Sequence, residues 1–117
     1  MGNMEKGIAF ENEMKHELER MGFVVFRQSK STIPDLIAFR EGRRGAYFFE
    51  CKMGLHPYLS REEKEFLNRL EEKLDVTCHH VWQKKKKNGR YGEVMLTHVK
   101  SGTTISFSTF EKNMNGA

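Results

Sequence analysis

The chain has 117 residues and a formal net charge of +4, with 38% hydrophobic and 31% charged residues. This length suits one domain with a modest core, so we expect residues 1–117 to form a single domain with a frayed end over 113–117. No apolar run approaches the ~20 residues of a membrane span, which argues against a membrane protein. Cys51 and Cys78 lie in apolar runs, as reduced core thiols of a cytoplasmic protein do.

The basic surplus lies in the last third of the chain, mostly in Lys84, Lys85, Lys86 and Lys87. A basic patch of this kind favours an anionic partner, and nucleic acid is the commonest one. The alternative is a solvated turn that only keeps the protein in solution. Charge by itself does not separate these two interpretations.

The first half of the chain predicts one helix followed by three strands. A helix over 5–21 is indicated by apolar residues at helical spacing, namely Phe10, Met14, Leu18 and Met21. Apolar runs predict strands over 23–26, 36–39 and 46–52, with a polar loop at 27–32. The turn at 41–45 contains two glycines that are free to adopt positive φ.

The second half predicts a helix and further strands. Ser60 and Glu63 form the pattern of a capping box, which predicts that a helix starts there. Strands follow over 76–83, 91–99 and, in short form, 105–107, with Asn88-Gly89 as a hairpin signal. The expected fold is α/β, with a mixed central sheet flanked by helices in the order α-β-β-β-α-β-β. The helical crossover should make the fourth strand parallel to the third.

Charged residues interrupt two of the apolar strands. Asp35 opens the second strand, and Glu50 and Lys52 end the third, where strand alternation turns both to one face. Buried charges of this kind are rare unless they are paired or bind a metal. An acid pair with an ammonium beside it suits a divalent cation that promotes phosphodiester hydrolysis. The alternative is a salt-bridged rim in which Lys52 neutralises both acids.

Other residues allow a functional and a structural interpretation. Glu11 lies at the edge of the apolar stripe of the first helix, where it could face the site or simply favour the helix N-terminus. Trp82 could stack on a base or could pack in the core or an interface. The adjacent His79 and His80 face opposite ways on a strand and cannot clamp one ion together.

On these residues the chain resembles the PD-(D/E)XK nuclease superfamily. Residues 6 to about 83 are most similar to the archaeal-type Holliday-junction resolvases. The similarity rests on Lys6-Gly7 before Glu11, the run from Arg27 to Ser31 into Asp35-Leu36-Ile37-Ala38, Glu50-Cys51-Lys52, and Tyr58-Leu59. The stand-alone VRR-NUC domains share Pro34-Asp35, Phe49-Glu50-Cys51-Lys52 and Leu59-Ser60, but usually carry Gln at the position of Glu63. The lysine turn matches neither family clearly.

The resemblance implies a restriction-endonuclease-like fold and an Mg²⁺-dependent DNA endonuclease, with Mn²⁺ as a substitute metal. Asp35 and Glu50 would bind the metal, Glu11 would bind it through water or complete a second site, and the backbone carbonyl of Cys51 is a further candidate ligand. Lys52 would stabilise the developing charge. The implied catalytic residues are Glu11, Asp35, Glu50 and Lys52. DNA contacts are expected from Lys6, Arg27, Lys30, Ser31, Arg43, Arg44, Lys84, Lys85, Lys86 and Lys87.

The implied substrate is branched or four-way junction DNA in recombination and repair. Two symmetric cuts by a chain with one site imply a homodimer, with no membrane and no small-molecule cofactor. Two alternatives remain open at this point. One is a VRR-NUC-type nuclease acting on flaps, single strands or RNA, and the other is a catalytically inert DNA-binding module.

Overall fold

The structure is a computed structural model that describes residues 2–29 and 32–115, with side chains from residue 7 onward. Within the described residues the chain forms three helices and a six-stranded sheet. In chain order the elements are α1 (Gly2–Arg20), β1 (Phe23–Arg27), β2 (Leu36–Arg40), β3 (Ala46–Gly54), α2 (Arg61–Lys73), β4 (Val76–Lys84), β5 (Met95–His98), β6 (Thr104–Ser106) and α3 (Phe107–Asn115).

The six strands follow one another across the sheet in chain order, β1-β2-β3-β4-β5-β6. Neighbouring strands are antiparallel except for β3 and β4, which are parallel and joined through α2. The predicted mixed sheet and the predicted parallel pair are therefore confirmed. The β2–β3 turn contains Gly42 and Gly45, both with positive φ as expected.

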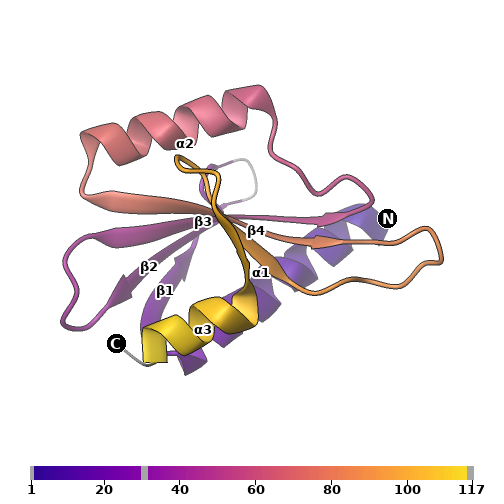
Figure 1. Cartoon of the computed structure of the whole chain (residues 1–117), viewed down its shortest axis with the longest axis horizontal. Coiled ribbons are helices and arrows are strands. Elements are labelled where there is room, and N and C mark those ends of the chain that lie inside the picture. The colour runs from indigo at the N-terminus through magenta and orange to yellow at the C-terminus, as the bar shows by residue number, and fades with distance from the viewer. Residues whose placement is uncertain (1, 30–31, 116–117) are drawn as a thin grey trace.

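The helices cover the two faces of the sheet unequally (Figure 1). Figure 1 shows α2 on one side of the sheet and α1 and α3 on the other. The larger core cluster lies on the side of α1 and α3 and includes Phe10, Met14, Leu18, Phe49, Val81, Leu96, Phe107 and Phe110. The smaller cluster centres on Leu59, Leu67 and Cys78 beneath α2. Leu67 has no exposed surface, so Leu67→Ala should cost about 2–5 kcal/mol of stability.

The C-terminal segment differs from the sequence prediction. The last strand is β6, and Phe107, predicted within that strand, is instead the first residue of the helix α3. Residues 113–115, predicted as part of a frayed end, form the last turn of this helix. The Ser106 hydroxyl accepts a hydrogen bond from the Thr109 N–H and so caps the helix N-terminus. Burial of Phe107 and Phe110 in the main core then holds the short helix on the sheet.

The strand over 91–99 is also shorter than predicted. Only Met95–His98 belongs to β5, and Tyr91 makes a single isolated bridge to Lys85. The predicted turn at Asn88-Gly89 closes the connection, with Gly89 at φ 85°.

Among the residues that the structure describes, no helix combines the length and apolar composition that a membrane crossing requires.

The strand directions decide which charged residues share an end of the sheet. Because β3 and β4 are parallel, Lys84 lies opposite Gly54, and Trp82 lies opposite Lys52. The lysine run therefore begins at the end of the sheet that carries Lys52. Arg43 and Arg44 lie in the β2–β3 turn at the other end, about 20 Å away at the usual rise of a strand.

Candidate active site

Asp35 and Glu50 lie side by side beneath the surface. Asp35 immediately precedes β2, and the β2–β3 register pairs Leu36 with Phe49, which brings Asp35 against Glu50. The Cys51 N–H donates to Asp35 Oδ2 at 2.8 Å, and the Asp35 N–H donates to Glu50 Oε1 at 3.1 Å. The two residues are only 7% and 5% exposed. The backbone of one strand therefore holds the carboxylate of the other in a defined orientation.

Burial makes these two carboxylates unstable as anions. It raises the pKa of Asp35 to about 6, against the opposing hydrogen bond from Cys51, with a further rise from the charge of Glu11. Burial, followed by the charge of Asp35, raises the pKa of Glu50 to about 8. The surroundings of the pair thus favour the protonated form of both acids.

Lys52 lies on the same face and is held by a residue from α2. Its ammonium Nζ is 2.7 Å from Glu63 Oε2 and 3.8 Å from Glu50 Oε2. Burial by itself lowers the pKa of Lys52, but the hydrogen bond and charge of Glu63 raise it above its ordinary value. The shortest ion pair of Lys52 is with Glu63 and its pair with Glu50 is longer, so the alternative of a rim in which Lys52 neutralises both acids is only partly realised.

Glu63 is a site residue that sequence reasoning did not identify. The capping box was recognised and is confirmed: the Ser60 N–H donates to Glu63 Oε1, and the Glu63 N–H donates to Ser60 Oγ. The second oxygen of Glu63 is then free to accept from Lys52. The pattern signalled a helix start, but the partner 11 residues away in sequence became visible only in the fold.

Glu11 is close to the acid pair but is held by another partner. Arg27 Nε lies 3.2 Å from Glu11 Oε1 and joins α1 to β1. Arg27, predicted as a DNA contact, is thus the ion-pair partner of a predicted catalytic residue. Within residues 2–29 and 32–115, no group of three or more His, Cys, Asp or Glu residues is arranged to hold a metal ion. Glu11 is therefore not brought into a three-carboxylate cluster.

The acid pair nevertheless has the chemistry of a hard-cation site. Asp35 and Glu50 present buried oxygen donors, and burial raises the pKa of both although the charge of Lys52 lowers it. Mg²⁺ prefers oxygen ligands, is commonly bound by one or two carboxylates and keeps several waters. The two buried carboxylates therefore fit such an ion.

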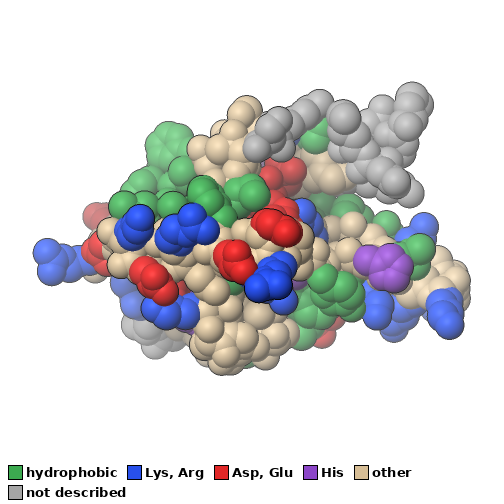
Figure 2. All heavy atoms as spheres, turned by 90° about the horizontal axis from the view of Figure 1, so that it is seen from above, with side chains coloured by type: hydrophobic (Ala, Val, Ile, Leu, Met, Phe, Trp, Pro, Cys, Tyr) green, Lys and Arg blue, Asp and Glu red, His purple; other side chains and the backbone are tan. Residues whose placement is uncertain are grey.

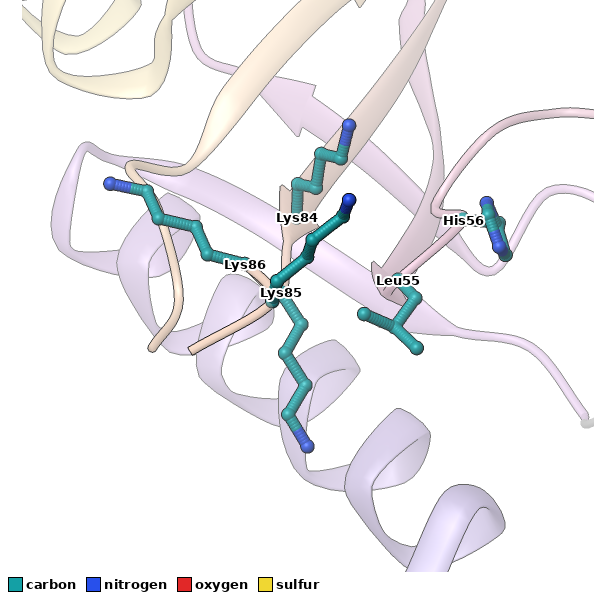
Figure 3. A pocket seen from close by; sticks show the side chains of 6 residues that line it. Leu55, His56, Lys84, Lys85 and Lys86 are labelled. Carbon is teal, nitrogen blue, oxygen red and sulfur yellow. The ribbon is translucent and has the colours of Figure 1, made fainter. Parts of the chain in front are cut away.

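The lysine run borders a cavity next to this site (Figure 3). The cavity has a volume of about 560 Å³ and is lined by Leu55, His56, Lys84, Lys85, Lys86 and Lys87. Figure 3 shows the side chains of Lys84 and Lys86 extending in different directions, and the ammonium groups of Lys84 and Lys85 lie over different rings, those of Tyr58 and Tyr91. Lys30 and Ser31 lie outside the described residues, and of Lys6 only the backbone within α1 is described.

The chain is similar in sequence to known resolvases. The family model described as archaeal Holliday junction resolvase (Hjc) matches residues 2–109. The crossover junction endodeoxyribonuclease Hjc of Methanocaldococcus jannaschii is 42% identical over 64 residues, which make up 53% of this chain and 47% of that protein. The match thus spans about half the length of this curated relative.

The fold has a counterpart among solved structures. The Holliday junction resolvase Hjc of Archaeoglobus fulgidus matches with a TM-score of 0.65 and 23% identity, covering 90% of this chain and 87% of that one. This likeness confirms the mixed α/β fold. Since the family model extends over nearly the whole described chain, the protein belongs to the archaeal Holliday junction resolvase family.

Proposed function

We propose that this protein is an Mg²⁺-dependent endonuclease that resolves four-way DNA junctions. The observation that carries the proposal is the convergence of Asp35, Glu50 and Lys52 at one end of the sheet, in a chain of this family. Recombination and repair are the processes that need such an enzyme. The two buried, free thiols of Cys51 and Cys78 suit the reducing cytoplasm as its setting.

The proposed chemistry assigns a task to each residue. Asp35 and Glu50 would hold the cation, the carbonyl of Cys51 would be a further ligand, and Glu11 would bind it through water or complete a second site. When bound, the cation supplies Lewis-acid polarisation of the scissile phosphate. Lys52 directs its ammonium at the phosphate oxygens, where negative charge grows as water attacks phosphorus and one P–O bond breaks. Glu63 keeps Lys52 protonated and aimed at that position.

The basic residues are proposed to supply most of the affinity for DNA. Lys84 lies beside the site with its ammonium over the Tyr58 ring, and Arg43 and Arg44 are exposed about 20 Å along the sheet. Phosphate contacts position a protein on DNA without reading its sequence. Basic groups at both ends of the sheet would let DNA lie across the active site.

A second copy of the chain is proposed to cover an exposed apolar face, which we call the β1–β2 face. It comprises Val24, Phe26 and Phe39, which are 45–59% exposed. The helix α2 packs on β4 and leaves these residues uncovered. Figure 2, viewed from the α2 side, shows hydrophobic side chains gathered along one flank of the molecule. A symmetric dimer across this face would supply the second active site that two cuts require.

Cleavage of a substrate panel tests the proposed activity. Purified protein is incubated with a four-way junction, linear duplex, flap, single strand and RNA, in Mg²⁺, Mn²⁺ or EDTA. We expect cleavage of the junction with either metal and none in EDTA. Undiminished cleavage in EDTA would refute metal dependence, preferred cleavage of flaps or RNA would reassign the substrate, and no cleavage at all would indicate an inert binding module.

A further inference from the structure

An aromatic pair lies beside the proposed active site and has no role in the chemistry described above. The ring centroids of Tyr58 and Trp82 are 5.9 Å apart. Trp82 lies directly opposite Lys52 in the parallel register of β3 and β4. Neighbouring strands are about 4.8 Å apart, so this aromatic surface adjoins the residue that faces the scissile phosphate.

Trp82 is fixed in place by its neighbours. Its indole Nε1–H donates to Thr97 Oγ1 at 3.0 Å, and its ring stacks on the imidazole of His80 at 6.0 Å. The imidazole is itself held, since His80 Nε2 lies 2.8 Å from the Pro57 carbonyl oxygen. The aromatic surface is therefore rigid before any ligand arrives, which reduces the entropic cost of binding.

Tyr58 presents an open ring with a cation over it. It is 49% exposed, although the adjacent Pro57 and Leu59 are buried and anchor the loop. Lys84 Nζ lies 5.8 Å from the centroid of the Tyr58 ring. The same lysine lines the 560 Å³ cavity, a size within the range of about 300–1,000 Å³ typical of ligand sites.

The sheet surface beside these side chains, at Gly54, is not covered by other atoms. Gly54 is the β3 residue opposite Lys84, and a Cβ placed there would meet no atom within 4 Å. A planar group could therefore approach the sheet at this point without displacing a side chain. The site therefore combines a half-exposed aromatic ring, a cation and an uncovered stretch of sheet next to a phosphate site. This combination matches the chemistry of a nucleobase with its backbone phosphate.

We propose that Tyr58, Trp82 and Lys84 form a subsite that holds one unstacked nucleobase next to the scissile phosphate. The base stacks on Tyr58 against the Trp82 edge, and its phosphate lies in the lysine-lined cavity. Unpaired or easily opened nucleotides occur at a branch point and are absent from an uninterrupted duplex. The subsite would thus contribute to the choice of branched DNA, an inference that rests on the proposed function.

The test uses the Asp35→Asn protein in EDTA, so that binding is measured without cleavage. The substrates are a four-way junction and a linear duplex, each with 2-aminopurine near the branch point or the matching duplex position. Stacking quenches the fluorescence of this base. The variants added are Tyr58→Phe, Tyr58→Leu and Tyr58→Ala. Tyr91→Ala is the matched control, because Tyr91 is also exposed, at 36%, and has Lys85 over its ring at 6.0 Å.

The proposal predicts a pattern that simple packing does not. Tyr58→Ala and Tyr58→Leu should each weaken junction binding by about 5- to 20-fold and raise the 2-aminopurine signal, while duplex affinity stays the same. Tyr58→Phe keeps the ring and should match the parent. Tyr58→Leu keeps apolar packing on Trp82, so a loss in that variant identifies stacking.

Three results would overturn the subsite. They are equal junction affinity in all variants, an equal loss on junction and duplex, or a loss in Tyr91→Ala as large as that in Tyr58→Ala. The melting temperature of each variant is measured to identify any loss that follows from unfolding. Failure of the proposed function would look different, because the unmodified protein would then cut no junction in Mg²⁺ whatever the fluorescence shows.

Discussion

Lys52 donates to Glu63 at 2.7 Å, and this contact joins the end of β3 to the first turn of α2. The same carboxylate closes the capping box of α2 through Ser60. One side chain therefore positions a helix and orients the ammonium that we assign to transition-state stabilisation. The pair is partly exposed, so solvent screens it, and its contribution to stability should be small.

Glu63→Gln separates these two roles. The amide oxygen can still accept from the Ser60 N–H, but the amide nitrogen can only donate and cannot hold Lys52. We expect a fall in kcat of at least tenfold with little change in DNA affinity. Because the pKa of Lys52 would fall, the decrease in rate on the alkaline side of the pH–rate profile should also begin at a lower pH. The measurement is single-turnover cleavage against pH.

The control for this variant is Glu62→Gln. Glu62 lies in the same helical turn and is exposed. The Glu62→Gln variant should leave both kcat and the pH–rate profile unchanged. If Glu63→Gln lowers only the melting temperature and leaves the pH–rate profile in place, Glu63 is a cap and nothing more.

Glu50→Gln should abolish cleavage and yet stabilise the protein in the absence of metal. The folded-state pKa of Glu50 is raised, so the stability associated with its protonated form is lost as pH rises from the unfolded value near 4.5 through about 8. The neutral amide avoids this loss. At pH 8.5 in EDTA we expect a gain of about 2 kcal/mol or more in the free energy of unfolding, measured with urea.

A divalent cation should offset the same loss of stability in the parent protein. Mg²⁺ binds the ionised pair, so the rise in melting temperature that it causes should be larger at pH 8.5 than at pH 6. The same ion should not stabilise Glu50→Gln. A variant less stable than the parent in EDTA at pH 8.5, or a Mg²⁺ effect independent of pH, would contradict the assignment of these carboxylates.

The lysine run should control affinity through salt-dependent phosphate contacts. Side chains in the run extend in different directions, so we expect about two of the four to touch phosphates. Each contact contributes about −0.9 to the slope of log affinity against log salt, and replacing all four lysines with Gln should flatten that slope by about 2. Filter binding at several salt concentrations measures the slope.

The position of Lys84 refines this prediction. Lys84 lies opposite Gly54, two residues beyond Lys52, and is not remote from the site as chain order had implied. The double variant Lys86→Gln, Lys87→Gln should therefore weaken binding without changing the rate at saturating DNA. Lys112→Gln on α3, across the sheet, serves as the control. An unchanged slope in the fourfold variant would leave the run as a solubility feature only.

The β1–β2 face should determine the oligomeric state. The rings of Phe26 and Phe39 contact each other at 6.2 Å and are 57% and 45% exposed. Phe39→Glu leaves the buried core intact but places a charge on this face. We expect the parent to be a dimer near micromolar concentration and the variant to be a monomer, measured by light scattering.

Loss of the dimer should also change how the protein cleaves a junction. The monomeric variant should nick one strand of a junction and lose the coordinated second cut. Leu55 is exposed to a similar degree as Phe39 and lies at the opposite end of the sheet. Leu55→Glu should therefore leave the dimer mass unchanged. A parent that stays monomeric both free and on junction DNA would favour a single-strand nicking role.

Much of the hairpin that carries the site could be predicted from sequence because its determinants are local. Alternation along β3 turns Glu50 and Lys52 to one face, and the glycine-rich turn pairs this strand with the one that follows Asp35. Ser60 and Glu63 mark the start of α2 within a single turn. Each of these features depends on residues that are neighbours along the chain or across one tight turn.

The chain pattern by itself singled out Asp35, Glu50 and Lys52, and it determined the order of the elements as far as β6 and the basic run after β4. Only the tertiary structure decided that Arg27 pairs with Glu11, that Glu63 holds Lys52, and that Trp82 lies beside Lys52 across a parallel pair. It also decided that Phe107 begins a helix, because burial against the sheet outweighs its strand propensity. These contacts join residues of different elements, and their register depends on how the helices and strands pack, which periodicity within one element does not encode.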